Sequence, residues 1–134
     1  MLTNKMIAKK WKGNKDLLSD FVVIPAILKS FNQKSLKKKL IYDAGCGSGR
    51  LAKQLAQRGA KVVAIDISDQ MIKEAQNDGC MKNIVFKKGD ILKIKSFDKK
   101  FDIVICNLVL NHFKDNEIET FLNNCYNILK KTEF

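Results

Sequence analysis

Short apolar runs alternate along the chain with longer segments whose apolar residues recur every three or four positions. The short runs have the length of β-strands and lie at residues 40–44, 61–66, 83–87 and 101–106. The longer segments have the pattern of amphipathic helices and lie at residues 48–58, 69–77 and 115–130. In the last of them the expected buried stripe is Ile118, Phe121, Leu122, Cys125, Ile128 and Leu129. Strands that alternate with helices predict an α/β fold, in which a doubly wound parallel sheet carries helices on its faces.

Three glycines follow the first strand at alternate positions, in Asp43-Ala-Gly-Cys-Gly-Ser-Gly49. The chain has to turn sharply there from a strand into a helix, and glycine accepts positive φ at no steric cost. The missing Cβ atoms also let a ligand lie against the backbone. A strand, a glycine turn and a helix form the usual ligand-binding corner of a doubly wound sheet.

The spacing of the glycines and the acid before them indicate which ligand this corner takes. A dinucleotide fingerprint is G-x-G-x-x-G, whereas here the third glycine comes one residue earlier. The carboxylate of Asp43 would repel a pyrophosphate and would suit an ammonium or sulfonium group. Both observations favour S-adenosylmethionine (SAM), whose reactive end is cationic, over NAD.

This stretch resembles the first motif of the class I SAM-dependent methyltransferases, written D/E-x-G-x-G-x-G. The resemblance extends over roughly residues 40–130 and implies a Rossmann-like sheet and SAM as the cofactor. It also implies that the turn contacts SAM through Asp43, Gly45, Cys46, Gly47 and Gly49.

The second strand ends in Asp66, which lies 21 positions after Gly45. A doubly wound nucleotide site has an acid at about this distance, where its carboxylate accepts hydrogen bonds from both ribose hydroxyls. The alternative is an acid that caps the next helix, although Ser68 or Asp69 is better placed for that. The segment Asp66-Ile-Ser-Asp-Gln-Met71 resembles the family's D-x-S-x-x-M, which implies that Ile67 and Met71 flank the adenine. Met71 is otherwise interpreted as helix core.

Two further segments resemble the family. Gly89-Asp90-Ile91 is similar to its G-D step, whose acid accepts a hydrogen bond from the adenine amino group, so Asp90 and the adjacent Ile91 are cofactor-binding candidates. Asp90 is otherwise interpreted as a turn residue. Phe101-Asp-Ile-Val-Ile-Cys-Asn-Leu-Val-Leu-Asn-His-Phe113 is similar to F-D-x-V-x-x-x-x-x-L-H-H. The resemblance implies that Asn107, at the end of the fourth strand, faces the methionine part of SAM.

Methyl transfer from SAM needs alignment and a dry cavity more than a reactive side chain. A base can help where the acceptor is an alcohol, a phenol or an acidic carbon. His112 is the single histidine and follows the fourth strand, so it is the candidate general base or substrate contact. Its alternative is a structural residue of the loop. Asn111 stands where the family often has a second histidine, which argues against a paired-histidine mechanism.

Residues 1–36 are expected to form a helical lid over the cofactor, with Pro25 starting or kinking a helical turn, and residues 37–134 the SAM-binding core. Trp11 is a candidate lid residue, and its alternative is an aromatic side chain that anchors the segment to the core. The length of 134 residues fits one domain overall.

Composition restricts the possible partners. The formal net charge of +11 suggests an anionic partner, either a nucleic acid or a membrane surface. The alternative is the codon bias of an AT-rich genome, because only Arg50 and Arg58 of the 25 basic residues are arginine and nucleic-acid readers favour arginine. Nucleic acid is therefore not the favoured partner. No apolar run reaches the ~20 residues that span a membrane, and no signal peptide is evident. The four cysteines lack paired spacing, which together with the single histidine argues against a metal site and predicts free thiols in the cytoplasm.

The family's pattern stops early in this chain. The family sheet has the strand order 3-2-1-4-5-7-6, and this sequence supplies strands for 3-2-1-4 only. The fourth strand, residues 101–106, would then be an apolar edge, which invites pairing. The sequence therefore predicts a truncated methyltransferase fold. Either this chain is a piece of a longer protein, or another chain covers the edge at residues 101–106. That chain would be a partner or a second copy in a homodimer.

The favoured function is transfer of a methyl group from SAM to a small-molecule acceptor, or the cofactor-binding part of such an enzyme. A non-catalytic SAM-binding or interaction module is the alternative, as is an RNA or protein methyltransferase subunit that needs a partner chain. Residues 107–110 lack the D/N-P-P-Y/F step of RNA amino-methyltransferases, which disfavours that chemistry. A dehydrogenase is disfavoured by the glycine spacing.

Overall fold

The computed structural model describes residues 22–31, 35–79, 81–107 and 109–131. It divides into two units, residues 1–34 and 35–134, each of which is described by itself. In the first unit helix α2 spans Ile24–Ser30, and Pro25 lies in its first turn, where proline starts a helix without loss of a hydrogen bond. Trp11 and most of the expected lid lie outside the described residues, so that assignment stays a prediction.

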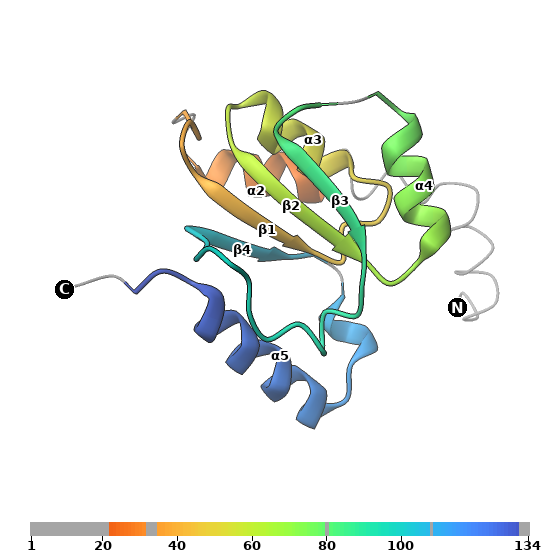
Figure 1. Ribbon diagram of the computed structural model, residues 1–134, viewed down its shortest axis with the longest axis vertical. Coiled ribbons are helices and arrows are strands. Elements are labelled where there is room, and N and C mark those ends of the chain that lie inside the picture. The colour runs from red at the N-terminus through yellow and green to blue at the C-terminus, as the bar shows by residue number, and fades with distance from the viewer. Residues whose placement is uncertain (1–21, 32–34, 80, 108, 132–134) are drawn as a thin grey trace. The chain divides into compact units, whose positions relative to one another are not determined.

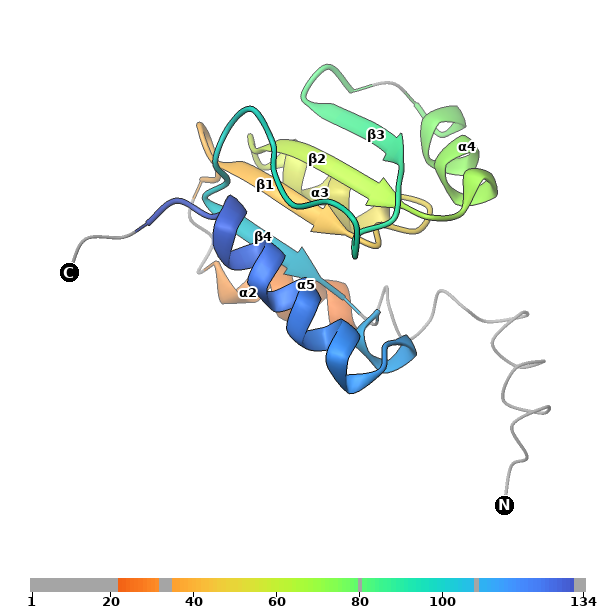
Figure 2. The same ribbon diagram turned by 60° about the horizontal axis from the view of Figure 1, so that its bottom comes forward.

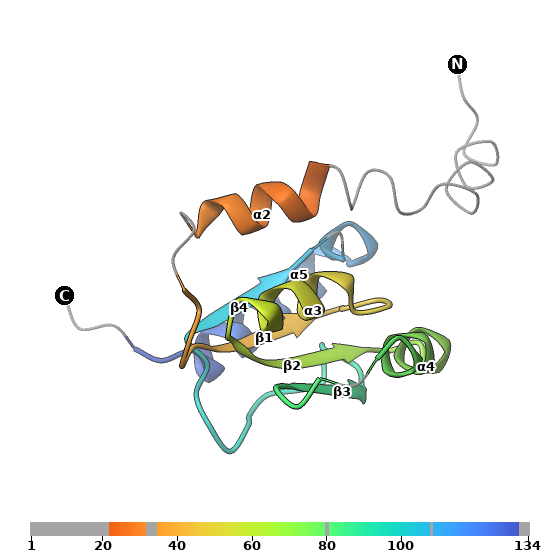
Figure 3. The same cartoon turned by 90° about the horizontal axis from the view of Figure 1, so that it is seen from above.

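The second unit is built on a four-stranded parallel sheet with the strand order β3-β2-β1-β4. Its strands are β1 (Leu40–Ala44), β2 (Lys61–Asp66), β3 (Ile84–Lys88) and β4 (Ile103–Cys106). Its helices are α3 (Arg50–Gln57), α4 (Asp69–Asn77), the 3-10 turn η2 (Leu110–His112) and α5 (Asp115–Ile128). The four arrows point the same way (Figures 1 and 3). This confirms the predicted fold class and the strand order 3-2-1-4.

One face of the sheet packs against α5, which lies in front of β1 and β4 in Figure 2. Tyr42 and Ala44 point from β1 into this layer, because alternate residues of a strand share a face. The rings of Phe97 and Phe101 lie 5.2 Å and 5.5 Å from the ring of Tyr42. These three aromatic side chains fill the middle of the layer and hold the long connection before β4 onto the sheet.

The other face carries α3, which lies behind the sheet in Figure 2. Its buried residues are Leu51, Ala52, Leu55 and Ala56, and the small alanines let the helix approach the strands closely. Helix α4 buries Ile72 and Ala75 and contacts β2 and β3. The helices therefore lie on both faces, as the alternating sequence pattern predicts.

The fourth strand starts later than the sequence suggested, at Ile103 rather than Phe101. The carboxylate of Asp102 accepts a hydrogen bond from the Leu40 N–H at 2.8 Å and pairs with Lys130 at 2.7 Å. The Leu40 hydrogen bond, followed by the Lys130 contact, lowers the pKa of Asp102. Phe101 instead forms an isolated parallel bridge with Leu129, directly after α5.

In the expected apolar stripe of the last helix one residue is exposed, and another packs against the core from just outside the helix. Leu122 is 54% exposed and points away from the core. Leu129 follows the helix, since α5 ends at Ile128 and Leu129 has extended backbone angles. The buried side of α5 contains instead an amide, Asn124, which is 8% exposed. The recurrence of apolar residues every three or four positions does not predict this, because such a pattern assigns only apolar residues to the core face.

None of the helices formed by residues 22–31 or 35–131, where described, has the length and apolarity to cross a membrane.

Candidate functional site

The carboxyl ends of the four parallel strands meet at one edge of the sheet, which is where open α/β sheets bind their ligands. A cavity of about 370 Å³ opens at this edge, within the size range of small-molecule sites. Its lining residues are Gly45, Asp66, Ile67, Gly89, Asp90, Ile91, Asn107, Val109, His112 and Phe113. Segments that follow all four strands thus contribute to one site.

Seven of the residues expected from the sequence line this cavity: Gly45, Asp66, Ile67, Asp90, Ile91, Asn107 and His112. The other five do not reach its wall: Asp43, Cys46, Gly47, Gly49 and Met71. The sequence interpretation did not single out three lining residues, Gly89, Val109 and Phe113. All three lie inside the segments that resemble the family, so their position beside Asp90 and His112 was the available signal.

The glycine turn is shaped by three positive φ angles, 79° at Gly45, 56° at Gly47 and 81° at Gly49. A Cβ at Gly45 would clash with the Val109 side chain, and a Cβ at Gly49 would come within 2.6 Å of the Phe86 ring. A Cβ at Gly47 would meet no atom within 4 Å. Two of the glycines are thus required by internal packing, and the middle one leaves open space above the backbone.

The turn also explains why α3 begins at Arg50 and not at residue 48. Gly49 is the N-terminal cap residue and has left-handed backbone angles, so the helix starts only after it. The N–H groups of Gly45 and Cys46 both donate to the Ile65 carbonyl, at 2.8 Å and 3.0 Å. These bonds fasten the turn to the end of β2, beside Asp66.

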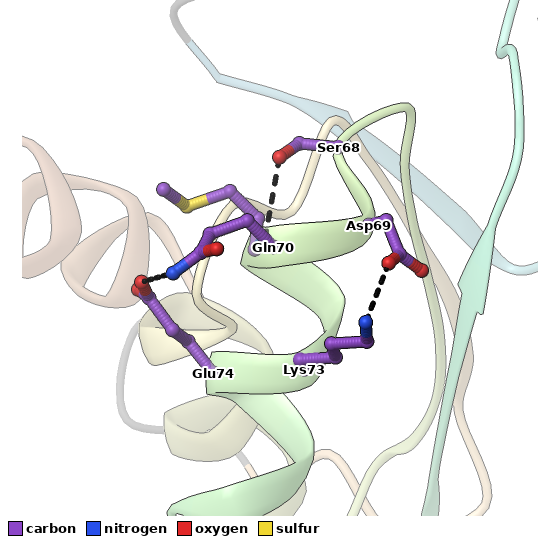
Figure 4. A network of polar contacts seen from close by, with 6 residues as sticks. Ser68, Asp69, Gln70, Lys73 and Glu74 are labelled. Carbon is purple, nitrogen blue, oxygen red and sulfur yellow. Dashed lines mark hydrogen bonds and ion pairs between the residues drawn. The ribbon is translucent and has the colours of Figure 1, made fainter.

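Asp66 is held by two backbone groups. One carboxylate oxygen accepts a hydrogen bond from the Gly47 N–H and the other from the Ser68 N–H, both at 2.9 Å. The cap of α4 is Ser68, whose hydroxyl accepts from the Met71 N–H at 3.3 Å (Figure 4). The alternative interpretation of Asp66 as the helix cap is therefore wrong. Each carboxylate oxygen keeps further acceptor capacity toward the cavity.

Helix α4 begins at Asp69, two residues after Ile67. Figure 4 shows two side-chain pairs along the helix, Asp69 with Lys73 at 2.8 Å and Gln70 with Glu74 at 3.0 Å. Ile67 is 67% exposed although it is apolar, and it lines the cavity. An apolar side chain exposed at a cavity suits the flat face of a planar ligand.

Asp90 is both a turn residue and a residue of the cavity wall, which were the two alternatives for it. One oxygen of its carboxylate accepts a hydrogen bond from the Leu92 N–H at 3.0 Å, and its carbonyl accepts from the Lys93 N–H at 3.0 Å. This is the local turn in which an aspartate bonds the backbone two residues on. The same residue also lines the cavity, so the turn presents it there.

Asp43 is one of the five expected site residues that do not line the cavity. It is 2% exposed, and one carboxylate oxygen has no hydrogen-bond partner among the described residues. Burial, and then the negative charge of Asp66, raises the pKa of Asp43 to about 7. Asp43 is thus buried and its carboxyl is only partly ionised at neutral pH, whereas the resemblance implies that it contacts the ligand directly.

The charge of the cavity contrasts with that of the chain. The wall contains Asp66 and Asp90, and none of its described lining residues is lysine or arginine. Lysines outnumber acids in the chain as a whole, which carries a net charge of +11. A wall of this kind attracts cations and repels phosphates. The described residues contain no group of three or more metal ligands.

The far end of the cavity is formed by the segment after β4. His112 belongs to η2, and its N–H donates to the Val109 carbonyl at 3.0 Å. Its side chain is exposed and lines the cavity beside Phe113. Asn107 lies between the carboxyl end of β4 and this segment. A ligand that reaches from Asp66 to His112 would cross the carboxyl ends of β2, β1 and β4.

Comparison with known proteins shows the family of the chain. A family model described as a methyltransferase domain matches residues 41–132, which is most of the chain. The chain belongs to this family, the class I SAM-dependent methyltransferases. The glycine turn, Asp66, Asp90 and His112 all lie inside the matched region.

Relatives of known sequence include the ubiquinone biosynthesis O-methyltransferase of Coxiella burnetii, which is 33% identical over 112 residues, 81% of this chain and 47% of the relative. The putative methyltransferase YqeM of Bacillus subtilis is 37% identical over 98 residues, 70% of this chain and 39% of the relative. The methyltransferase chain described here thus spans about half the length of these curated relatives, or less.

Two solved structures show the same fold. Magnesium protoporphyrin IX methyltransferase (ChlM) from Synechocystis, with bound SAM, superimposes with a TM-score of 0.65 at 31% identity and covers 80% of this chain and 51% of its own. A TehB-like SAM-dependent methyltransferase from Corynebacterium glutamicum gives a TM-score of 0.70 at 21% identity. The match covers 93% of this chain and 66% of the Corynebacterium chain.

Proposed function

We propose that this chain binds SAM and serves the transfer of its methyl group to a small-molecule acceptor. The observation that carries the proposal is the acid-lined cavity at the glycine turn, in a chain that belongs to the methyltransferase family. The wall suits a ligand with a cationic sulfonium and an ammonium group, and it does not suit a pyrophosphate.

In this proposal Asp66 binds the ribose hydroxyls with the acceptor capacity that its backbone partners leave free. Ile67 lies against the adenine ring, and Asp90 accepts from the adenine amino group, with Ile91 behind it. Asn107 and Gly45 lie where the methionine part would pass. Met71 is not part of the wall, so its part in binding adenine has no support from the geometry.

SAM would supply an activated methyl group, to whose carbon the acceptor atom forms a bond in line with the breaking C–S bond, so that the thioether S-adenosylhomocysteine leaves. The C–S bond electrons stay on sulfur, and the acceptor's proton leaves to a base. His112 is the titratable side chain of the wall at the end that we assign to the acceptor, and Phe113 offers it an apolar surface. The chain's contribution is then to align the two reactants and to receive the proton.

Substitution of His112 tests this assignment. His112→Gln is expected to slow methyl transfer from radiolabelled SAM to a small phenol such as catechol by roughly 100-fold, the lower end of the usual range for a general base. Its Kd for SAM should stay within about twofold, because the residue lies at the acceptor end. Asn111→Gln, at the exposed neighbouring position, is the matched control.

Two results would contradict parts of the proposal. Transfer at the wild-type rate by His112→Gln would leave His112 as a structural residue of the loop. SAM binding by the wild-type chain without transfer to any hydroxyl or phenol tested would favour the alternative, a SAM-binding module without catalysis.

We also propose that a further strand covers the outer edge of β4, from a continuation of the chain, a partner chain or a second copy. All four residues of β4 are apolar or cysteine and half-buried, and among the described residues β1 is its single strand partner. Such an edge pairs readily with another strand. Sedimentation velocity of the purified chain is expected to show self-association at high concentration, and a cooperatively folded monomer throughout would argue against an uncovered edge.

Cytoplasmic location stays a prediction. It is supported by the three cysteines of the described residues, Cys46, Cys106 and Cys125, which are all free thiols. Burial raises the pKa of Cys125 to about 11, which keeps this thiol protonated and unreactive at neutral pH.

A further inference from the structure

Asn124 is a buried amide on the core side of α5. It is 8% exposed, and its neighbours on that side of the helix are Phe121, Cys125 and Ile128. Among the described residues only Asp43 is comparably buried and polar. An amide in such a position loses its hydration unless it finds a partner, so its partner shows what the amide does.

The partner lies in the long connection between β3 and β4. The side-chain NH₂ of Asn124 donates to the Leu92 carbonyl at 3.1 Å. This connection, residues 89–102, contains a turn but no helix or strand, and it runs beside α5 in both Figure 1 and Figure 2. A connection of this length without regular structure depends on side chains for its shape.

The N–H group of Leu92 bonds to a residue of the cavity wall. It donates to the carboxylate of Asp90 at 3.0 Å. Leu92 thus lies between the two side chains: its carbonyl accepts from Asn124, and its N–H donates to Asp90. Two hydrogen bonds thus connect the middle of α5 with an acid of the cavity wall, although Asn124 lies 32 positions after Leu92 in the chain.

Packing alone does not fix this geometry. Leu92 and Ile94 pack against the core cluster and hold the connection in place. Apolar contacts are not directional, however, whereas the hydrogen bonds at Leu92 set the orientation of the backbone on both sides of its Cα. The orientation of the Asp90 carboxylate follows from the second of these bonds.

We propose that Asn124 is a positioning residue for the adenine contact of Asp90, so that α5 contributes to recognition of the base without touching it. The inference rests on the proposed function, in which Asp90 accepts from the adenine amino group. It adds a specificity-determining residue outside the cavity. A side chain that served only the stability of α5 would not change the choice between bases.

The test compares two ligands and two matched variants by calorimetry on the full chain. S-adenosylhomocysteine carries the amino group, and S-inosylhomocysteine carries a carbonyl oxygen in its place. The wild type is expected to prefer the adenosyl ligand by at least about tenfold, since a site built to accept a hydrogen bond rejects a ligand that cannot donate one. Asn124→Leu should reduce that preference by roughly three- to tenfold, the usual effect of one hydrogen bond.

Asn123→Leu is the control, because it makes the same substitution at the exposed position next in the helix. It should leave both affinities unchanged. Equal weakening of both ligands by Asn124→Leu would overturn the proposal and leave a purely structural amide. Failure of the wild type to bind S-adenosylhomocysteine would instead refute the proposed function, so the two failures are distinguishable.

Hydrogen exchange of the Leu92 amide gives a readout that needs no ligand. Its exchange is expected to be at least about tenfold faster in Asn124→Leu than in Asn123→Leu, because the Leu92 carbonyl loses the hydrogen bond that orients this backbone segment and with it the Leu92 N–H toward Asp90. If Asn124→Leu does not fold, Asn124→Ser replaces it, because the serine hydroxyl is too short to reach Leu92. The ligand preference and the exchange rate of the Leu92 amide are then measured on that variant. Unchanged protection of Leu92 in the Asn124 variant would overturn the proposal.

Discussion

Asp66→Ala is expected to weaken SAM binding by at least about 100-fold. The carboxylate organises the turn through the Gly47 and Ser68 N–H groups and, in the proposed complex, binds the ribose. Hydrogen bonds to a charged group contribute about 1.5–3 kcal/mol each, and the substitution removes the acceptor of two backbone donors as well as the ribose contact. A loss of about 3 kcal/mol corresponds to roughly a 100-fold change in Kd.

Calorimetric titration of the variant with SAM measures this effect. The matched control is Asp69→Ala, which removes an acid three residues on that is exposed and paired with Lys73 at 2.8 Å. Its affinity should stay within about twofold of the wild type. An Asp66→Ala affinity within threefold of the wild type would show that the ribose is bound elsewhere.

Gly49→Ala is expected to lower the free energy of unfolding by about 2 to 5 kcal/mol. The new Cβ would come within 2.6 Å of the Phe86 ring in a buried position, and overpacking of this kind costs about 1–3 kcal/mol. The φ of 81° adds about 1–2 kcal/mol for an L-residue. Such a loss is a large part of the ~5–15 kcal/mol by which domains are stable.

Urea unfolding followed by circular dichroism measures the loss, and two other glycines separate its causes. Gly47→Ala and Gly79→Ala carry the backbone cost without a clash, since their Cβ atoms meet nothing within 4 Å, so each should lose about 1–2 kcal/mol. Equal losses for all three variants would refute the packing argument.

The strands were predictable from the sequence because buried parallel strands are short apolar runs that end at polar residues. Residues 40–44 and 61–66 form strands with the predicted bounds, and α4 likewise spans residues 69–77 as expected. The order of the strands followed from the family resemblance. Ends of elements were harder to predict, as at Gly49, where a positive φ delays the start of the helix by two residues.

Features that depend on contacts between distant segments were not predictable. Nothing in the pattern around Asn124 shows that a carbonyl 32 residues earlier needs a donor. The burial of Asp43 was equally hidden, because a motif gives the residue type and not the direction of the side chain. Seven of the expected site residues did converge on one cavity, since the carboxyl ends of parallel strands share an edge.

The central claim is that the cavity binds SAM and not a dinucleotide. Calorimetric titration of the wild-type chain with SAM, and in parallel with NAD, tests it most directly. We predict micromolar binding of SAM and no measurable binding of NAD, because the wall is acidic and the glycine turn lacks the dinucleotide spacing. A folded chain that binds NAD, or that binds neither ligand, would contradict the account.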